Sequence, residues 1–188
     1  MRGAVAAASG SNGAQDKQYV LINLLKAVAA QLIVLHHLAF YGPMADHARV
    51  LAPAVFDWLA DDARIAVQVF LVIGGFLAAK SLSPNGLLGI KHPLRTIYRR
   101  YLKLAPPFLV AMLLAIGASA LASLWMTHPS ISAPPSFAQF SAHALLLHDV
   151  LGYEALSAGA WYVAIDFQLF ALMTLLLWAG GRFAAGRL

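Results

Sequence analysis

The sequence contains no cysteine and few charged residues. Of its 188 residues, 11% are charged and only 8 are acidic. The absence of cysteine excludes disulfides, thiolate chemistry and metal sites built on cysteine. Soluble proteins average about 25% charged residues, and a soluble domain of this size could not cover its surface with so few. The composition therefore excludes an ordinary soluble enzyme, a disordered chain and a nucleic-acid-binding domain.

What the sequence does contain is apolar. Hydrophobic residues make up 61% of the chain, and the mean hydropathy is +0.72. These values are typical of a chain whose main partner is the lipid bilayer. We therefore predict an all-α membrane protein, a polytopic bundle of transmembrane helices with about four or five hydrophobic segments and no β-sheet.

The apolar stretches are separated by polar and proline-containing segments. Four of them are long enough to cross a bilayer: 19–41, 65–82, 104–126 and 160–181. The stretch 137–151 is shorter than the ~20 residues that a crossing needs, so we expect a re-entrant or interfacial helix there. A second short interfacial helix is expected at 50–60. The polar stretch 1–18 is predicted to be a disordered tail, and 19–188 to form the bundle.

Charge is distributed unevenly between the segments. Six of the 13 basic residues lie between Lys80 and Lys103, with no acidic residue among them, whereas 44–64 holds four of the 8 acidic residues. Because basic loops stay on the cytoplasmic side, 80–103 is predicted to be cytoplasmic. The N-terminus is then cytoplasmic too, and 44–64 lies outside.

One lysine and two histidines, Lys26, His36 and His37, lie in the first apolar stretch, where a charge costs about 2.5–3.5 kcal/mol. Lys26 and His37 are eleven residues apart. That spacing is close to three helical turns, so we expect both side chains on one face, ~16 Å apart along the axis. For this pair a role inside the bundle is favoured over snorkelling. For His36, on another face, an ordinary interfacial position is favoured.

The last apolar stretch carries a single acidic residue, Asp166, about two turns from its start. A carboxylate there must be paired or protonated, which favours a functional role over simple packing. The basic segment 91–103 has helical spacing, with Arg95 and Arg99 on one face and Arg100 and Lys103 on another. It could bind an anionic cofactor at the membrane surface, although such loops are common in multi-pass proteins.

Four short motifs resemble those of acyltransferase family 3, whose members are integral-membrane enzymes that O-acylate sugars, exopolysaccharides and lipid-linked glycans. In chain order they are Lys26 with His37, Phe70–Phe76, Arg100 with Lys103 and Pro106, and Trp161–Asp166. Five positions depart from the family pattern in residue type. Lys26 and Lys103 stand where the family has Arg, Gly74 stands where it has Ser, and Asp166 where it has Glu. Tyr162 also replaces a Ser.

The resemblance implies an acyltransferase that takes its acyl group, most simply acetyl, from cytoplasmic acyl-CoA. The acceptor is a hydroxyl of a cell-surface carbohydrate or glycolipid. No permanently bound cofactor, no metal and no nucleic-acid partner is expected, and the location is a bacterial inner or plasma membrane. The implied binding residues are Lys26, Arg95, Arg99, Arg100 and Lys103 for the donor and Trp161 and Tyr162 for the acceptor.

His37 is the implied general base on the acceptor hydroxyl, with Asp166 orienting its imidazole. The two reach one membrane depth only if the last span runs inward and 137–151 does not cross. Arg182 and Arg187 are then cytoplasmic, as the positive-inside rule prefers.

Family members are about twice this length, so the resemblance implies a missing C-terminal half. The chain is then a fragment, a truncated reading frame or a half-protein. Two other classes stay open. One is a non-catalytic membrane subunit, scaffold or transporter half. The other, less favoured, is a haem protein with His36 or His37 and His143 or His148 as axial ligands.

Overall fold

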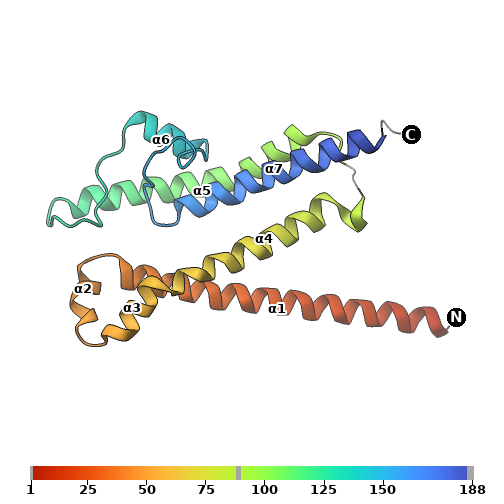
Figure 1. The fold of residues 1–188 in the computed structure, drawn as a ribbon, viewed down its shortest axis with the longest axis horizontal. Helices are drawn as coiled ribbons and strands as arrows, with labels where there is room; N and C mark the ends of the chain where they lie inside the picture. The colour runs from red at the N-terminus through yellow and green to blue at the C-terminus, as the bar shows by residue number, and fades with distance from the viewer. Residues whose placement is uncertain (1, 88–89, 186–188) are drawn as a thin grey trace. The chain divides into compact units, whose positions relative to one another are not determined.

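A computed structural model describes residues 2–87 and 90–185 of the chain. Every regular element in these ranges is a helix, and no strand occurs there (Figure 1). Four helical stretches are long and apolar enough to cross a membrane: Tyr19–Phe40, Pro53–Leu82, Pro93–Ala122 and Ala160–Phe183. The predicted class, an all-α polytopic membrane bundle, is confirmed.

The chain divides into two compact units, Met1–Ile73 and Gly74–Leu188, which we call the first and second units. The first unit contains α1 (Arg2–Phe40), α2 (Pro43–Arg49), α3 (Pro53–Asp61), the 3-10 helix η1 (Ala63–Ile65) and the start of α4 (Ala66–Leu82). Two of these helices begin with proline, whose missing N–H is not needed at a first helical position. In this unit α1 packs mainly against α3 and η1.

Two boundaries in the first unit are informative. α3 matches the interfacial helix expected at 50–60, and the break at η1 separates it from α4 as predicted. In contrast, α1 begins at Arg2, so the helix also covers the stretch 2–18 that the sequence predicted as a tail. Alanine, the best helix former, is frequent in that stretch, and this offsets its polar character.

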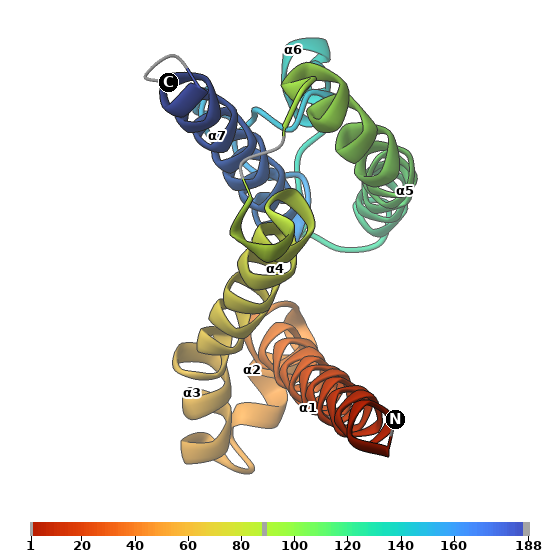
Figure 2. The same cartoon turned by 90° about the vertical axis from the view of Figure 1, so that its right-hand side faces the viewer.

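The second unit contains the rest of α4, the 3-10 helix η2 (Pro84–Gly86), α5 (Pro93–Ala122), α6 (Phe137–Ala144) and α7 (Ala160–Ala185). α5 and α7 lie side by side, and both views show this (Figures 1 and 2). They are antiparallel, because Phe108 packs near the start of α7 at Ala160, whereas Pro93 and Arg182 line one groove at the other end. Residues 137–151 therefore do not carry the chain to the opposite end.

α5 begins earlier than the sequence predicted. The expected span started at 104 with Pro106 and Pro107 in its first turn, but α5 starts at Pro93 and contains both prolines in its interior. The two prolines remove the N–H groups that would bond to the carbonyls of Leu102 and Lys103, four residues earlier. Such gaps are tolerated in membrane helices. The basic segment is consequently the first part of α5 and not a loop.

α6 and the turns after it are packed against the middle of α5 and the start of α7. The core of the second unit joins these elements through Phe108, Met112, Leu146, Leu156, Ala160 and Ala164, all buried. The Tyr101 hydroxyl donates to the carbonyl of Ala144 (2.9 Å), and the Gln168 amide donates to that of Leu146 (2.8 Å). These bonds satisfy carbonyls that no helix satisfies, which lipid cannot do. The short helix expected in 137–151 is present as α6, and whether it is re-entrant or interfacial stays a prediction.

Candidate active site

In the first unit, Lys26 and His37 lie on the covered side of α1. Lys26 and His37 are both half-buried, and fully buried Ala29 lies between them on the same side, whereas Leu25 and Leu38 are exposed. The expected shared face is therefore present. The His37 ring lies 5.8 Å from the Tyr41 ring one turn later. An imidazole in this position is partly shielded from lipid while part of it stays accessible.

His36, for which an ordinary interfacial position was favoured, has a structural contact. It is 8% exposed, and its Nδ1 lies 2.9 Å from the carbonyl oxygen of Leu59 in α3. Nδ1 must carry the proton to donate to this carbonyl, which leaves Nε2 as the acceptor nitrogen. The bond links α1 to α3 and indicates a structural role for His36, unlike the more accessible His37.

In the second unit, Asp166 of α7 is paired with Arg100 of α5. Arg100 Nη2 donates to Asp166 Oδ2 at 2.6 Å, and the side chains are 35% and 17% exposed. The Arg100 guanidinium also lies over the Phe170 ring, 5.2 Å from its centre. A carboxylate amid apolar helices needs a partner. Its partner is Arg100, because α5 begins early enough to bring this residue beside α7.

The other groups around Asp166 come from α4 and α7. A Cβ on Gly74 would lie 3.2 Å from Asp166 Oδ1, so the α4 backbone passes close to this carboxylate. The close helix approach expected at this glycine is confirmed. Tyr162 precedes Asp166 by one turn and interacts electrostatically with both Asp166 and Arg100. Trp161, half-buried like Tyr162, has its ring edge-on to the Tyr162 ring at 6.4 Å.

The four basic residues of α5 divide into two groups. Arg95, Arg99 and Lys103 are exposed along one face at four-residue spacing, whereas Arg100 is half-buried against α7. The expected grouping of Arg100 with Lys103 is therefore wrong, because Arg100 turns toward Asp166. The three exposed cations are the ones that remain available for an anionic ligand. Arg100 instead has its positive charge balanced by the carboxylate.

His143 and His148, which the sequence offered only as alternative axial ligands of haem, form a buried pair. The rings of His143 and His148 stack at 3.9 Å with an 8° interplanar angle, and neither is exposed. His143 Nδ1 donates to the Gln139 carbonyl (2.8 Å), and Nε2 accepts from the Leu156 N–H (3.1 Å). Both of its ring nitrogens are engaged and neither is free to bind haem iron.

His148 has fewer partners. Neither ring nitrogen makes a hydrogen bond among the described residues, although Nε2 lies 3.4 Å from the Asp149 carboxylate. Burial lowers the pKa of His148, the neighbouring His143 lowers it further, and Asp149 opposes the shift. On α5 the ring of Phe108 stacks beside it at 6.5 Å. No signal in the sequence reveals this pair, since its packing depends on turns that follow α6.

No group of three or more His, Cys, Asp or Glu side chains in the described ranges could hold a metal ion. Among the described side chains, the first unit offers an accessible imidazole on α1, and the second unit offers a paired carboxylate on α7 and a row of exposed cations on α5. The imidazole can remove a proton from a hydroxyl, and the cations can bind an anion.

Comparison with known families agrees with this chemistry. The model of the Acyltransferase domain of acyltransferase family 3 matches residues 19–187, nearly the whole chain. The chain belongs to this family. It is therefore a membrane protein of an acyltransferase family, and the resemblance drawn from the four motifs is confirmed.

A relative gives a more distant comparison. The chain is 27% identical over 140 residues to the "Regulator of hypoxia-inducible factor 1" of Caenorhabditis elegans. The aligned part covers 74% of this chain and 27% of that protein, so the chain spans about a quarter of the relative's length. No solved structure matches the chain.

Proposed function

We propose that the protein is a membrane-bound O-acyltransferase. It moves an acyl group, most simply acetyl, from acyl-CoA to a hydroxyl of a cell-surface sugar, polysaccharide or lipid-linked glycan. The observation that carries the proposal is the family match over residues 19–187. The half-buried imidazole of His37 and the exposed cations of α5 support it, since the reaction needs a base and an anion site.

Donor binding is assigned to the basic start of α5 and to Lys26. The exposed cations Arg95, Arg99 and Lys103 contact the phosphates of coenzyme A, and Lys26 meets the part of the donor that enters the bundle. Arg100, which the sequence placed in the same set, contributes through its charge while it holds Asp166. Trp161 and Tyr162 contact the acceptor.

His37 acts as the general base in the transfer. Its neutral imidazole takes the proton of the acceptor hydroxyl as the oxygen attacks the thioester carbonyl. The new C–O bond forms, the C–S bond breaks, and the coenzyme A thiolate recovers the proton from the imidazolium. The assignment of Asp166 as the carboxylate partner of His37 is part of the proposal and rests on the sequence. Arg100 occupies one of its oxygens, Oδ2.

The proposed location is a bacterial inner or plasma membrane, with the N-terminus and the basic start of α5 in the cytoplasm. Cysteine labelling tests this orientation, because the chain has no native cysteine. A cysteine at Asn85 should react with an impermeant maleimide only after permeabilisation. One at Gly159, before α7, should react in intact cells. The opposite pattern would reverse the orientation and place the donor site on the wrong side.

Acyl transfer itself is tested in membranes that contain the protein, radiolabelled acetyl-CoA and glycan from the host. His37→Gln should reduce label in the glycan by about 100-fold or more, as expected for loss of a general base. The matched control is His47→Gln. His47 is exposed on α2, so this substitution removes an imidazole without changing α1. Equal transfer by His37→Gln and the wild type would overturn the base assignment.

A failure of transfer by the wild type would favour the other class, a non-catalytic subunit or transporter half. In that case acetyl-CoA binding to the purified protein separates the two. If the chain binds acetyl-CoA without transfer, and transfer appears once a C-terminal half is added, the acyltransferase proposal stands. Absence of both binding and transfer with that half present contradicts it.

A further inference from the structure

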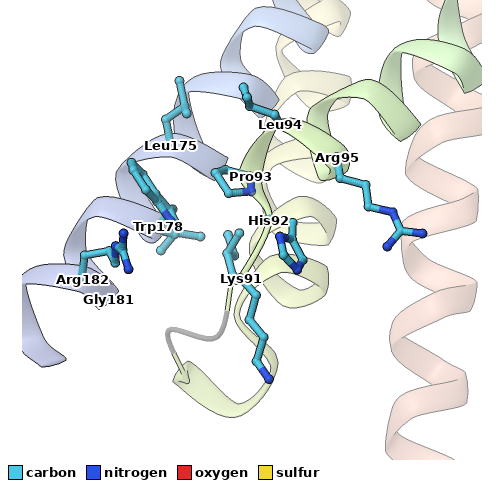
Figure 3. A pocket seen from close by; sticks show the side chains of 11 residues that line it. Lys91, His92, Pro93, Leu94, Arg95, Leu175, Trp178, Gly181 and Arg182 are labelled. Atoms are coloured by element: carbon cyan, nitrogen blue, oxygen red, sulfur yellow. The ribbon is translucent and has the colours of Figure 1, made fainter.

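A groove at one end of the second unit is lined by residues that, apart from Arg95, have no role in the proposed acyl transfer. It has a volume of about 980 Å³, near the upper end of the range of ~300–1,000 Å³ for small-molecule sites. It lies between the segment that leads into α5 and the last turns of α7 (Figure 3). Arg182 and Trp178 form one wall, and Lys91, His92 and Pro93 form the other.

The position of the groove is that of a membrane surface. Pro93 is the first residue of one candidate span, and Arg182 lies in the last turn of another, which ends at Phe183. Cations and tryptophan are the residues that collect where span ends meet lipid headgroups. Trp178 is half-buried here, with the Arg182 guanidinium 5.7 Å from its ring centre.

The lining combines two chemistries in a fixed order. Lys91, His92 and Arg182 lie at the polar rim, and no acidic residue lines the groove. Farther into the span the walls are apolar, with Leu94, Leu175, Leu177 and Trp178. Arg95 also lines the groove, although its side chain extends away from the α7 wall (Figure 3). A ligand that fits this lining has an anionic headgroup for the cations and apolar chains for the deeper walls, as a phospholipid does.

We propose that this groove binds an anionic glycerophospholipid of the surrounding membrane. Its phosphate contacts Lys91 and Arg182, and an acyl chain lies along Trp178 and Leu175. Basic pockets between transmembrane helices are the usual sites for such headgroups. The bound lipid joins the start of α5 to the end of α7, where the polar contacts between those helices, such as Arg100 with Asp166, have ended. The proposal does not depend on acyl transfer.

Quenching of Trp178 fluorescence tests the proposal with the full chain in detergent. The probes are phosphatidylglycerol and phosphatidylcholine with brominated acyl chains, since bromine quenches a tryptophan that it touches. The signal of Trp178→Phe is subtracted to remove the other tryptophans. Phosphatidylglycerol should reach half-maximal quenching at a concentration about tenfold or more below that of phosphatidylcholine, because two cations contact the phosphate.

Two double variants distinguish lipid binding in the groove from a general attraction of anionic lipid to positive charge. Lys91→Gln with Arg182→Gln should abolish the preference for phosphatidylglycerol. Arg99→Gln with Lys103→Gln removes the same charge from exposed positions of the same helix end, outside the groove, and should keep the preference. Equal effects of both pairs, or no preference in the wild type, would overturn the proposal.

A third measurement distinguishes the lipid from the acyl donor. Coenzyme A, without any acyl chain, is added to protein quenched by brominated phosphatidylglycerol. Unchanged quenching supports a lipid site. Recovery of fluorescence at concentrations that saturate donor binding would make the groove part of the donor site and overturn the lipid assignment, while leaving the acyltransferase proposal in place.

Discussion

In the first unit, α1 satisfies its own backbone N–H and C=O groups by helical bonds, and side chains add local links such as His36 to Leu59. In the second unit, the chain leaves the helix at 145–148, and the carbonyls of Ala144 and Leu146 rely on side chains of α5 and α7 for the same purpose. Each unit has a charged pair between helices, but Arg49 and Asp57 of the first unit are 46% and 58% exposed, whereas Arg100 and Asp166 of the second are 35% and 17% exposed. The comparison teaches that apolar periodicity alone can build the first arrangement, whereas the second needs particular polar side chains.

The largest effect should come from Arg100→Ala, which leaves Asp166 with an unpaired charge. Breaking a fully buried pair costs about 3–5 kcal/mol. Because Arg100 is 35% exposed, we expect a loss of about 2 kcal/mol in the free energy of unfolding. Reversible unfolding in mixed micelles measures it.

Arg99→Ala is the matched control for that change, one residue away and exposed, and should alter stability by about 0.5 kcal/mol or less. Arg100→Met combined with Asp166→Leu removes both charges and should recover most of the loss. If the two single arginine variants were equally stable, the ion pair would not distinguish the second unit.

A smaller effect is expected when the side chains that donate to carbonyls at the end of α6 and in the turn after it are changed. Tyr101→Phe and Gln168→Leu each leave a carbonyl, that of Ala144 or Leu146, without its hydrogen bond. Such bonds inside membranes contribute about 0.6 kcal/mol on average and up to about 1.7. Hydrogen exchange should accelerate in 144–150 and stay unchanged in α1. Uniform acceleration along the chain would show that the segment does not open on its own.

In the first unit, His36→Leu should cost about 1 kcal/mol, since it removes one neutral hydrogen bond and keeps most of the apolar volume. The loss should appear as faster exchange in α3, whose Leu59 carbonyl loses its partner. Acyl transfer should persist in this variant. If transfer fell as far as in His37→Gln, the division of roles between the two histidines would be wrong.

The smallest effect concerns pH and His148. Its lowered pKa means that the unfolded state binds more protons between the folded value and the ordinary 6.5, so stability falls as the pH drops through this window. The groups that face the ring are His143, Asp149 and the uncharged Phe108. Exchange in 144–150, corrected for intrinsic rates, should rise a few-fold from pH 7.5 to 5.5. His148→Phe should remove this dependence.

The sequence predicted the spans, the shared face of Lys26 and His37 and the family, because each depends on local periodicity or a short motif. It placed Asp166 in need of a partner but could not find Arg100. That pairing depends on α5 starting at Pro93. In the sequence, the two internal prolines indicated a helix that starts later. The stacked histidines and the lipid groove combine residues from separate segments, so no periodic pattern marks them.

The internal prolines of α5 have a mechanical consequence. With two successive backbone bonds missing, the helix is least stiff beside Pro106 and Pro107. Arg100 lies six residues before Pro106, about 9 Å along the axis, and is fastened to α7 by its bond to Asp166. α5 therefore consists of two stiff segments, one before and one after the two prolines, that are joined by a more flexible turn. A force on the basic end of α5 is transmitted to α7 through the Arg100–Asp166 ion pair before it reaches the two prolines. The part of α5 toward Ala122 can therefore tilt while the basic part stays aligned with α7.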